Sequence, residues 1–169
     1  VNLKPYTPEP KVYLGQLAYL LLSNFEILTN ELKYSPTTQY KAELSEAAAK
    51  SFEKYRTISK KLVGLGFDVT DSMDPFTERV DTFHSRTAGI DWYESVIKIY
   101  LVSGLLDDFY GRLAAGLPKE LREAVEKALS DKTFEKFAKK VLVEGMAGNP
   151  QLESRLALWG RRLMGDVLL

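Results

Sequence analysis

Ser51 and Lys54 are the two residues whose types and spacing bear most directly on chemistry in this sequence. Ser51 belongs to an apolar line with steps of four and three residues, which predicts a helix packed against neighbouring helices: Leu44, Ala48, Ser51, Tyr55, Ile58, Leu62 and Leu65. In a bundle with a di-metal carboxylate site, such a line carries a Glu and, three residues later, a His. A hydroxyl and an ammonium stand at that spacing here, so the sequence predicts that such a site is vacated.

A second line with a serine near its middle predicts another long helix: Trp92, Val96, Ile99, Ser103, Leu106, Tyr110, Leu113 and Leu117. A helical serine can hydrogen-bond its own backbone, so hydroxyls would remove the cost of inward acids at a site that has lost its metal. Small residues that let helices approach closely explain each serine equally well. The pairing of Ser51 with Ser103 favours the vacated site.

Carboxylates on several helices could still form a rebuilt site for iron or manganese. The acids that flank the apolar lines are the fallback ligands for such a site: Glu26, Asp107 and Glu144. Glu94 and Asp108 fall between apolar positions, so we predict that they lie on a solvated or salt-bridged face, with Glu94 paired to Lys98 one turn later. Burying an ionised carboxylate costs several kcal/mol unless a metal or counter-charge offsets it.

Other catalytic chemistry has little support. The single histidine, His84, is placed beside a predicted loop, where a capping or packing role is favoured over general-base catalysis. The chain has no Gly-rich phosphate loop, no G-x-G-x-x-G pattern and no Walker pattern, which leaves nucleotide chemistry without a motif.

Length and composition predict one soluble domain that spans residues 1–169. The 23 basic and 23 acidic residues balance, so no overall field attracts nucleic acid or a membrane surface. The chain has no cysteine, which excludes disulfides and thiolate metal sites and suits a reducing compartment. No apolar run approaches the roughly 18 residues of a membrane span, and the first residues lack signal-peptide character. We therefore expect a cytoplasmic protein.

Apolar spacing and breakers predict an all-α antiparallel helix bundle with additional short helices. The three long helices are expected over 11–33, from Pro36 to the breakers Gly64 and Gly66, and from the cap Asp91 to about residue 117. Shorter helices are expected from Asp74-Pro75 to 86 and over 118–129, 133–146 and 152–168, with a linker over 67–73. We find no pattern typical of a strand.

Five segments resemble the ferritin-like proteins grouped with tRNA hydroxylases: 81–87, 91–95, 98–100, 104–110 and 156–165. The resemblance implies a ferritin-like fold related to di-iron monooxygenases that hydroxylate a modified adenosine beside the tRNA anticodon. Their second helix carries Glu-x-x-His followed by an aromatic residue, where this chain has Ser51-Phe52-Glu53-Lys54-Tyr55. An acid corresponds to Ser103, and a His and an acid correspond to Phe134 and Lys136. The resemblance therefore carries over fold and ancestry but no metal ligands.

Three hypotheses of function follow. The first is a non-catalytic, metal-free ferritin-like bundle that acts as a binding or scaffold protein and forms a homodimer through an exposed helix face. The second is a hydroxylase-type oxidoreductase with the rebuilt carboxylate site. The third is RNA binding through basic residues of the last two helices, for which tRNA affinity would fall steeply with salt: Lys136, Lys139, Lys140, Arg155, Arg161 and Arg162. Neighbouring acids favour a solvated face over a nucleic-acid surface.

Overall fold

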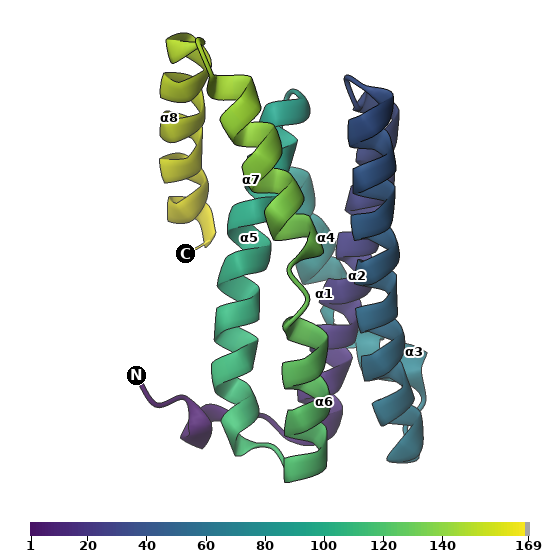
Figure 1. The fold of residues 1–169 in the computed structure, drawn as a ribbon. Helices are drawn as coiled ribbons and strands as arrows, with labels where there is room; N and C mark the ends of the chain where they lie inside the picture. The colour runs from purple at the N-terminus through teal and green to yellow at the C-terminus, as the bar shows by residue number, and fades with distance from the viewer. Residues whose placement is uncertain (168–169) are drawn as a thin grey trace.

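The chain folds as a bundle of helices, and the computed structural model describes residues 1–167 (Figure 1). Within these residues every regular element is a helix, as the sequence predicts. The α-helices are α1 (Pro10–Glu31), α2 (Thr38–Gly64), α3 (Val69–Met73), α4 (Thr77–Arg86), α5 (Trp92–Leu113), α6 (Lys119–Leu129), α7 (Thr133–Met146) and α8 (Pro150–Val167). The predicted last residue of the final helix, Leu168, lies outside the described residues.

The topology contains one long crossover. Helices α1 and α2 form an antiparallel pair, and α3 and α4 then carry the chain back along the bundle to the start of α5 (Figure 1). As a result, α2 and α5 run in the same direction. The helices α6 and α7 follow one another along α2 and α5, and α8 packs on the outer side of α5 and α7.

The fourth position of the bundle is thus filled by two helices with a break at residues 130–132. Ser130 Oγ donates to the Lys127 carbonyl at 2.7 Å and closes the end of α6. The Asp131 carboxylate accepts from Thr133 Oγ1 at 2.8 Å and from Thr133 N at 3.4 Å, which starts α7. The break places Asp131 beside α2, at mid-height in the bundle.

Helix ends explain most of the predicted boundaries. Asp91 caps α5 as predicted, because its Oδ1 accepts from Glu94 N at 2.9 Å. The prediction that Pro36 starts the second helix is wrong, since Thr37 is the N-cap and its Oγ1 accepts from Tyr40 N at 3.0 Å. Gly66 ends the α2 region with a φ of 82°, a conformation that glycine adopts without strain.

The segment between α2 and α5 is more helical than the sequence indicates. The predicted linker over 67–73 contains α3, which Asp68 caps by accepting from Asp71 N at 2.9 Å. Asp74 and Pro75 begin a 3₁₀ turn, and α4 starts at Thr77. Short polar helices of this kind leave little periodicity to detect in a sequence.

The core consists of two apolar clusters, one toward each end of the bundle. The first cluster includes Tyr13, Leu14, Leu17, Leu21, Ile58, Leu62, Tyr110, Leu113, Val125 and Leu129. The second cluster includes Leu28, Leu44, Ala48, Trp92, Val96, Ile99, Phe137, Val141, Leu152 and Leu156. On α1, α2 and α5 the change from one cluster to the other takes place around a polar residue, namely Asn24, Ser51 and Ser103. None of the helices between residues 1 and 167 has the length and apolar character that crossing a membrane would require.

The contact between α1 and α3 gives a test of this packing. A Cβ at Gly15 would overlap the backbone carbonyl of Ser72, whereas a Cβ at Gly111 in α5 would meet nothing within 4 Å. We expect Gly15→Ala to lower the free energy of unfolding by about 1–3 kcal/mol, because α3 must shift. The control Gly111→Ala should be neutral or stabilise by up to about 1 kcal/mol. Urea denaturation measures both, and equal stability of the two variants would contradict the packing described.

Candidate functional site

Three polar side chains meet between the two apolar clusters, and we call Asn24, Ser51 and Ser103 the polar layer. Asn24 Nδ2 donates to Ser51 Oγ at 3.1 Å, and Ser103 Oγ donates to Asn24 Oδ1 at 3.4 Å. Ser51 also donates to the Leu21 carbonyl at 3.4 Å and is only 4% exposed. The two predicted serines are therefore joined through an amide from α1.

Asn24 is the residue of this layer that the sequence reasoning missed. It stands three residues after Leu21 and four before Leu28, both of which are buried. A polar residue at that spacing on the core-facing side of a helix is the signal that could have identified it. The half-buried amide of Asn24 has donors and an acceptor to satisfy, and the two hydroxyls on neighbouring helices supply partners for both.

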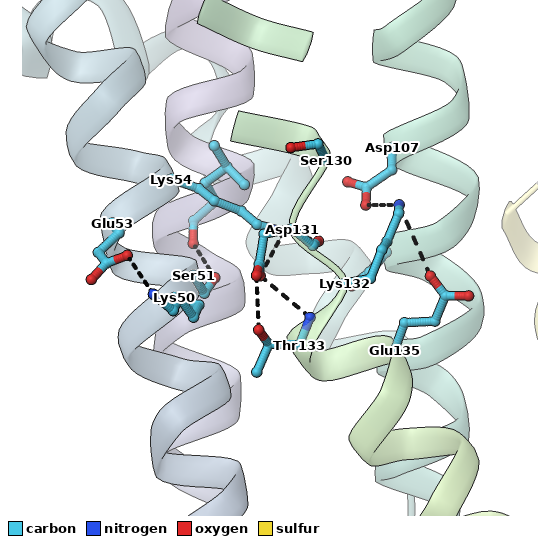
Figure 2. A network of polar contacts seen from close by, with 12 residues as sticks. Lys50, Ser51, Glu53, Lys54, Asp107, Ser130, Asp131, Lys132, Thr133 and Glu135 are labelled. Atoms are coloured by element: carbon cyan, nitrogen blue, oxygen red, sulfur yellow. Dashed lines mark hydrogen bonds and ion pairs between the residues drawn. The ribbon is translucent and has the colours of Figure 1, made fainter. Parts of the chain in front are cut away.

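Lys54 joins α2 to the break between α6 and α7 (Figure 2). Its Nζ donates to the Asp131 carbonyl at 3.2 Å and lies 3.8 Å from Asp131 Oδ2. The Lys54 side chain is 17% exposed, so this charged contact is partly shielded from water. The ammonium thus satisfies a carbonyl that the broken helix leaves without a helical partner, and it offsets the charge of the Asp131 carboxylate.

A second lysine holds a second aspartate on the opposite side of the break. Lys132 Nζ lies 3.3 Å from Asp107 Oδ2 on α5 and 4.0 Å from Glu135 Oε2 (Figure 2). Burial raises the pKa of the Asp107 carboxyl, while the charges of Lys54 and Lys132 act to lower it. Ammonium groups and carboxylates therefore alternate around the break, and the carboxylates lie beside positive charge that the chain itself supplies.

A cavity of about 500 Å³ lies next to the polar layer and follows α5. Of the residues predicted as vacated-site positions or fallback ligands, Lys54, Ser103, Asp107 and Phe134 line it. Ser51 contacts this region through Asn24, which is a lining residue.

Lys136, Glu26 and Glu144 are exposed and do not line the cavity. Glu144 instead accepts a hydrogen bond from the Tyr40 hydroxyl. The structure therefore does not bring the three fallback acids together.

The donor groups at the polar layer do not match the ligands of a di-metal carboxylate centre. Such a centre needs carboxylates and imidazoles directed inward, and the groups present are an amide, two hydroxyls and the Lys54 ammonium. A positive charge held at this point opposes a divalent cation. Among the side chains of residues 1–167, no group of three or more His, Asp or Glu is arranged to hold a metal ion.

Glu94 forms a salt bridge, but the predictions that it faces away from the packed side of α5 and pairs with Lys98 are wrong. Glu94 is 3% exposed, and its carboxylate accepts from Arg155 Nη1 at 2.9 Å and from Ile90 N at 3.1 Å. Arg155 also donates to Asp91 Oδ2 at 2.6 Å. The reason is that α8 packs on this side of α5. The face of α5 opposite its apolar line, which carries Glu94, is therefore buried and not in solvent. Lys98, the predicted partner of Glu94, instead donates to the His84 carbonyl at 3.0 Å.

Six basic residues of the last two helices could contact RNA, and three of them form ion pairs with acidic side chains of this chain. Lys139 lies 2.9 Å from Glu135, Lys140 lies 2.7 Å from Glu43, and Arg155 bridges Asp91 and Glu94. Their charge is therefore largely neutralised within the fold. Lys136, Arg161 and Arg162 are exposed.

A second polar group lies between α1, α4 and α5, around a smaller cavity of about 170 Å³. Lys98 is 5% exposed, and burial lowers the pKa of its ammonium to about 8. Burial, together with the charge of Lys98, lowers the pKa of His84 to about 4, so its ring is neutral at pH 7. His84 Nδ1 is buried and has no hydrogen-bond partner within the described residues. His84 lies at the end of α4 as predicted, but it also lines both cavities.

An all-α bundle with one long crossover and a polar centre is typical of the ferritin-like class. The chain belongs to the family described as "Ferritin-like domain, actinomycetes", whose model matches residues 8–169. This finding confirms the ferritin-like part of the resemblance seen in the sequence. No curated protein matches the chain at a significant level.

The network around the break predicts how one charge affects another. Since the Lys54 charge acts to lower the pKa of Asp107, we expect Lys54→Met to raise the pKa of that carboxyl further. The matched control is Lys60→Met, because Lys60 is an exposed lysine on the same helix. An NMR titration of the Asp107 carboxyl measures the effect in both variants. An unchanged pKa in Lys54→Met would show that this ammonium does not act on Asp107.

Proposed function

We propose that this chain is a metal-free ferritin-like bundle that acts as a binding protein and not as a metal-dependent oxidoreductase. The observation that carries the proposal is the Lys54 ammonium, which stands at the centre of the bundle beside Asp131. An amino group there supplies the positive charge that a metal ion supplies in a di-metal bundle. The charge is covalently part of the chain, so the fold needs no ion to neutralise its inward acids.

The cavity supports a binding role. Its volume of about 500 Å³ falls within the range of about 300–1,000 Å³ found for small-molecule sites. Its walls combine leucines from α1 and α5 with a few polar groups, among them Asn24 and Ser103. Apolar walls with few convergent polar groups are typical of ligand sites.

The alternative is an iron- or manganese-dependent hydroxylase with a rebuilt carboxylate set. One observation favours it: Asp107, one of the three fallback ligands, lines the cavity. Kinship with the tRNA hydroxylases, and RNA binding with it, stays a prediction from the sequence resemblance alone. The hydroxylase requires a metal centre, and RNA binding requires an RNA partner. The proposed binding role requires neither.

Metal analysis separates the two functions. We expect protein made in iron- and manganese-supplemented medium, and then incubated anaerobically with ferrous iron, to hold far less than one ion per chain after desalting. Inductively coupled plasma mass spectrometry gives the content. The variant Asp107→Asn serves as the control, because nonspecific iron would persist in it. A stoichiometric ion that Asp107→Asn abolishes would overturn the proposal and favour the oxidoreductase.

We also infer that the protein forms a homodimer through an exposed helix face, and the exposed apolar side chain of Leu158 on α8 is the best test of it. Leu158 is 66% exposed and Val63, at the end of α2, is 63% exposed. We expect Leu158→Glu to convert a dimer to the monomer mass, because a buried charge without a partner is costly at an interface. Light scattering after size exclusion measures the mass. The control Val63→Glu should leave the mass unchanged, and a monomeric wild-type protein would contradict the inference.

A further inference from the structure

Lys98 lies where the two cavities meet. It lines both of them, together with His84, Ile27 and Ile99. The larger cavity continues from Lys98 along α5 to Asp108, and a helical segment of that length rises about 15 Å. One end of this elongated space therefore carries a buried ammonium group.

The Lys98 ammonium has fewer charged partners than the more exposed cations Lys54, Lys132 and Arg155. Its hydrogen bond goes to a backbone carbonyl, that of His84, and the Phe83 ring lies 6.0 Å from Nζ. Within the described residues no carboxylate lies within 4.0 Å of it, whereas Lys54, Lys132 and Arg155 each contact at least one. Glu31 acts on Lys98 only from a distance, and a buried ammonium without a counter-charge in contact costs several kcal/mol. An anion placed in the adjoining cavity would remove that cost.

The walls beyond Lys98 define the rest of the ligand. Between Lys98 and the break they are formed mainly by apolar side chains, among them Leu17, Leu20, Leu101, Leu105 and Met164. Apolar area in such a space favours hydrocarbon at about 25 cal/mol per Å² removed from water. An ammonium at one end, apolar walls along the middle and the charged groups of the break at the far end, among them Lys54 and Asp107, match an amphipathic molecule whose hydrocarbon chain ends before the break.

We propose that this cavity binds a medium-chain carboxylate, with the carboxylate on the Lys98 ammonium and the hydrocarbon chain along α5. The proposal rests on the proposed binding function and names its ligand class. The carboxylate would accept hydrogen bonds from the remaining N–H groups of the Lys98 ammonium. Such charge-assisted hydrogen bonds are stronger than those between neutral groups. The His84 side chain lines both cavities beside Lys98 and contributes to the wall around the proposed carboxylate.

The titratable groups around Lys98 set the pH dependence of binding. Glu31 faces the smaller cavity from α1, and burial raises the pKa of its carboxyl. His84 from α4 is neutral at pH 7, and Asp81 lies close enough to act on it. Lys98 becomes protonated as the pH falls through about 8. Lower pH therefore adds positive charge at Lys98 and reduces negative charge at Glu31, and both changes favour an anion.

Decanoate and decanol are the probes for this site, measured by isothermal titration calorimetry with the full chain. We expect Lys98→Met to weaken decanoate binding by about tenfold to a hundredfold, the effect of losing a charge-assisted hydrogen bond. Decanol binding should be unchanged, because it depends on the apolar walls. Met has a similar volume and carries no charge, so the variant should fold at least as well as the wild type. The matched control is Lys136→Met, since Lys136 is exposed and lines neither cavity.

The outcomes separate this inference from the proposed function. Decanoate binding that depends on Lys98 and weakens as the pH rises through 8 supports the inference. Equal decanoate affinity in the wild type and Lys98→Met, or no saturable binding, overturns it. The metal content of the same samples tests the proposed function independently. A metal-free protein that does not bind decanoate would therefore contradict this inference and leave the proposed function standing.

Discussion

The contact between Lys54 and the break in the fourth helix is the interaction on which the centre of this bundle depends. A helix that stops at mid-height leaves carbonyl groups without helical partners and, here, a carboxylate beside the core. The Lys54 ammonium contacts both the carbonyl and the carboxylate of Asp131. Without it, the Asp131 carbonyl would lose this hydrogen bond, and the Asp131 carboxylate would keep only its hydrogen bonds from Thr133.

The polar layer shows a second way to hold the same helices together. A metal centre joins helices through charged ligands whose burial is offset only while the ion is bound. Asn24 joins α1 to α2 and α5 through neutral hydrogen bonds, which need no cofactor and carry little desolvation cost. The chain therefore has a polar centre in which neutral hydrogen bonds pair three helices.

Helix α8 changes the environment of α5. It covers a face of α5 that would otherwise be in water, and Arg155 enters with it to neutralise Glu94. On the side of α5 that faces α1 and α4, Lys98 is buried to a similar degree without an acid in contact. One buried charge is matched within the fold and the other is matched only in part, by Glu31 at a distance. This difference points to Lys98 as the position where a ligand could contribute.

The sequence alone determined the helical class, the long helices and the two serines on the inward sides of their helices, because apolar spacing and breakers are local properties of the chain. It also determined that the pattern of Glu and His expected of a di-metal helix is missing at Ser51 and Lys54. Asn24 could have been found from its place between Leu21 and Leu28. The burial of Glu94 and Lys98 could not, since it depends on which helices cover α5. Only the tertiary structure decided that Lys54 would meet Asp131, because residues 77 positions apart become neighbours through packing and not through local spacing.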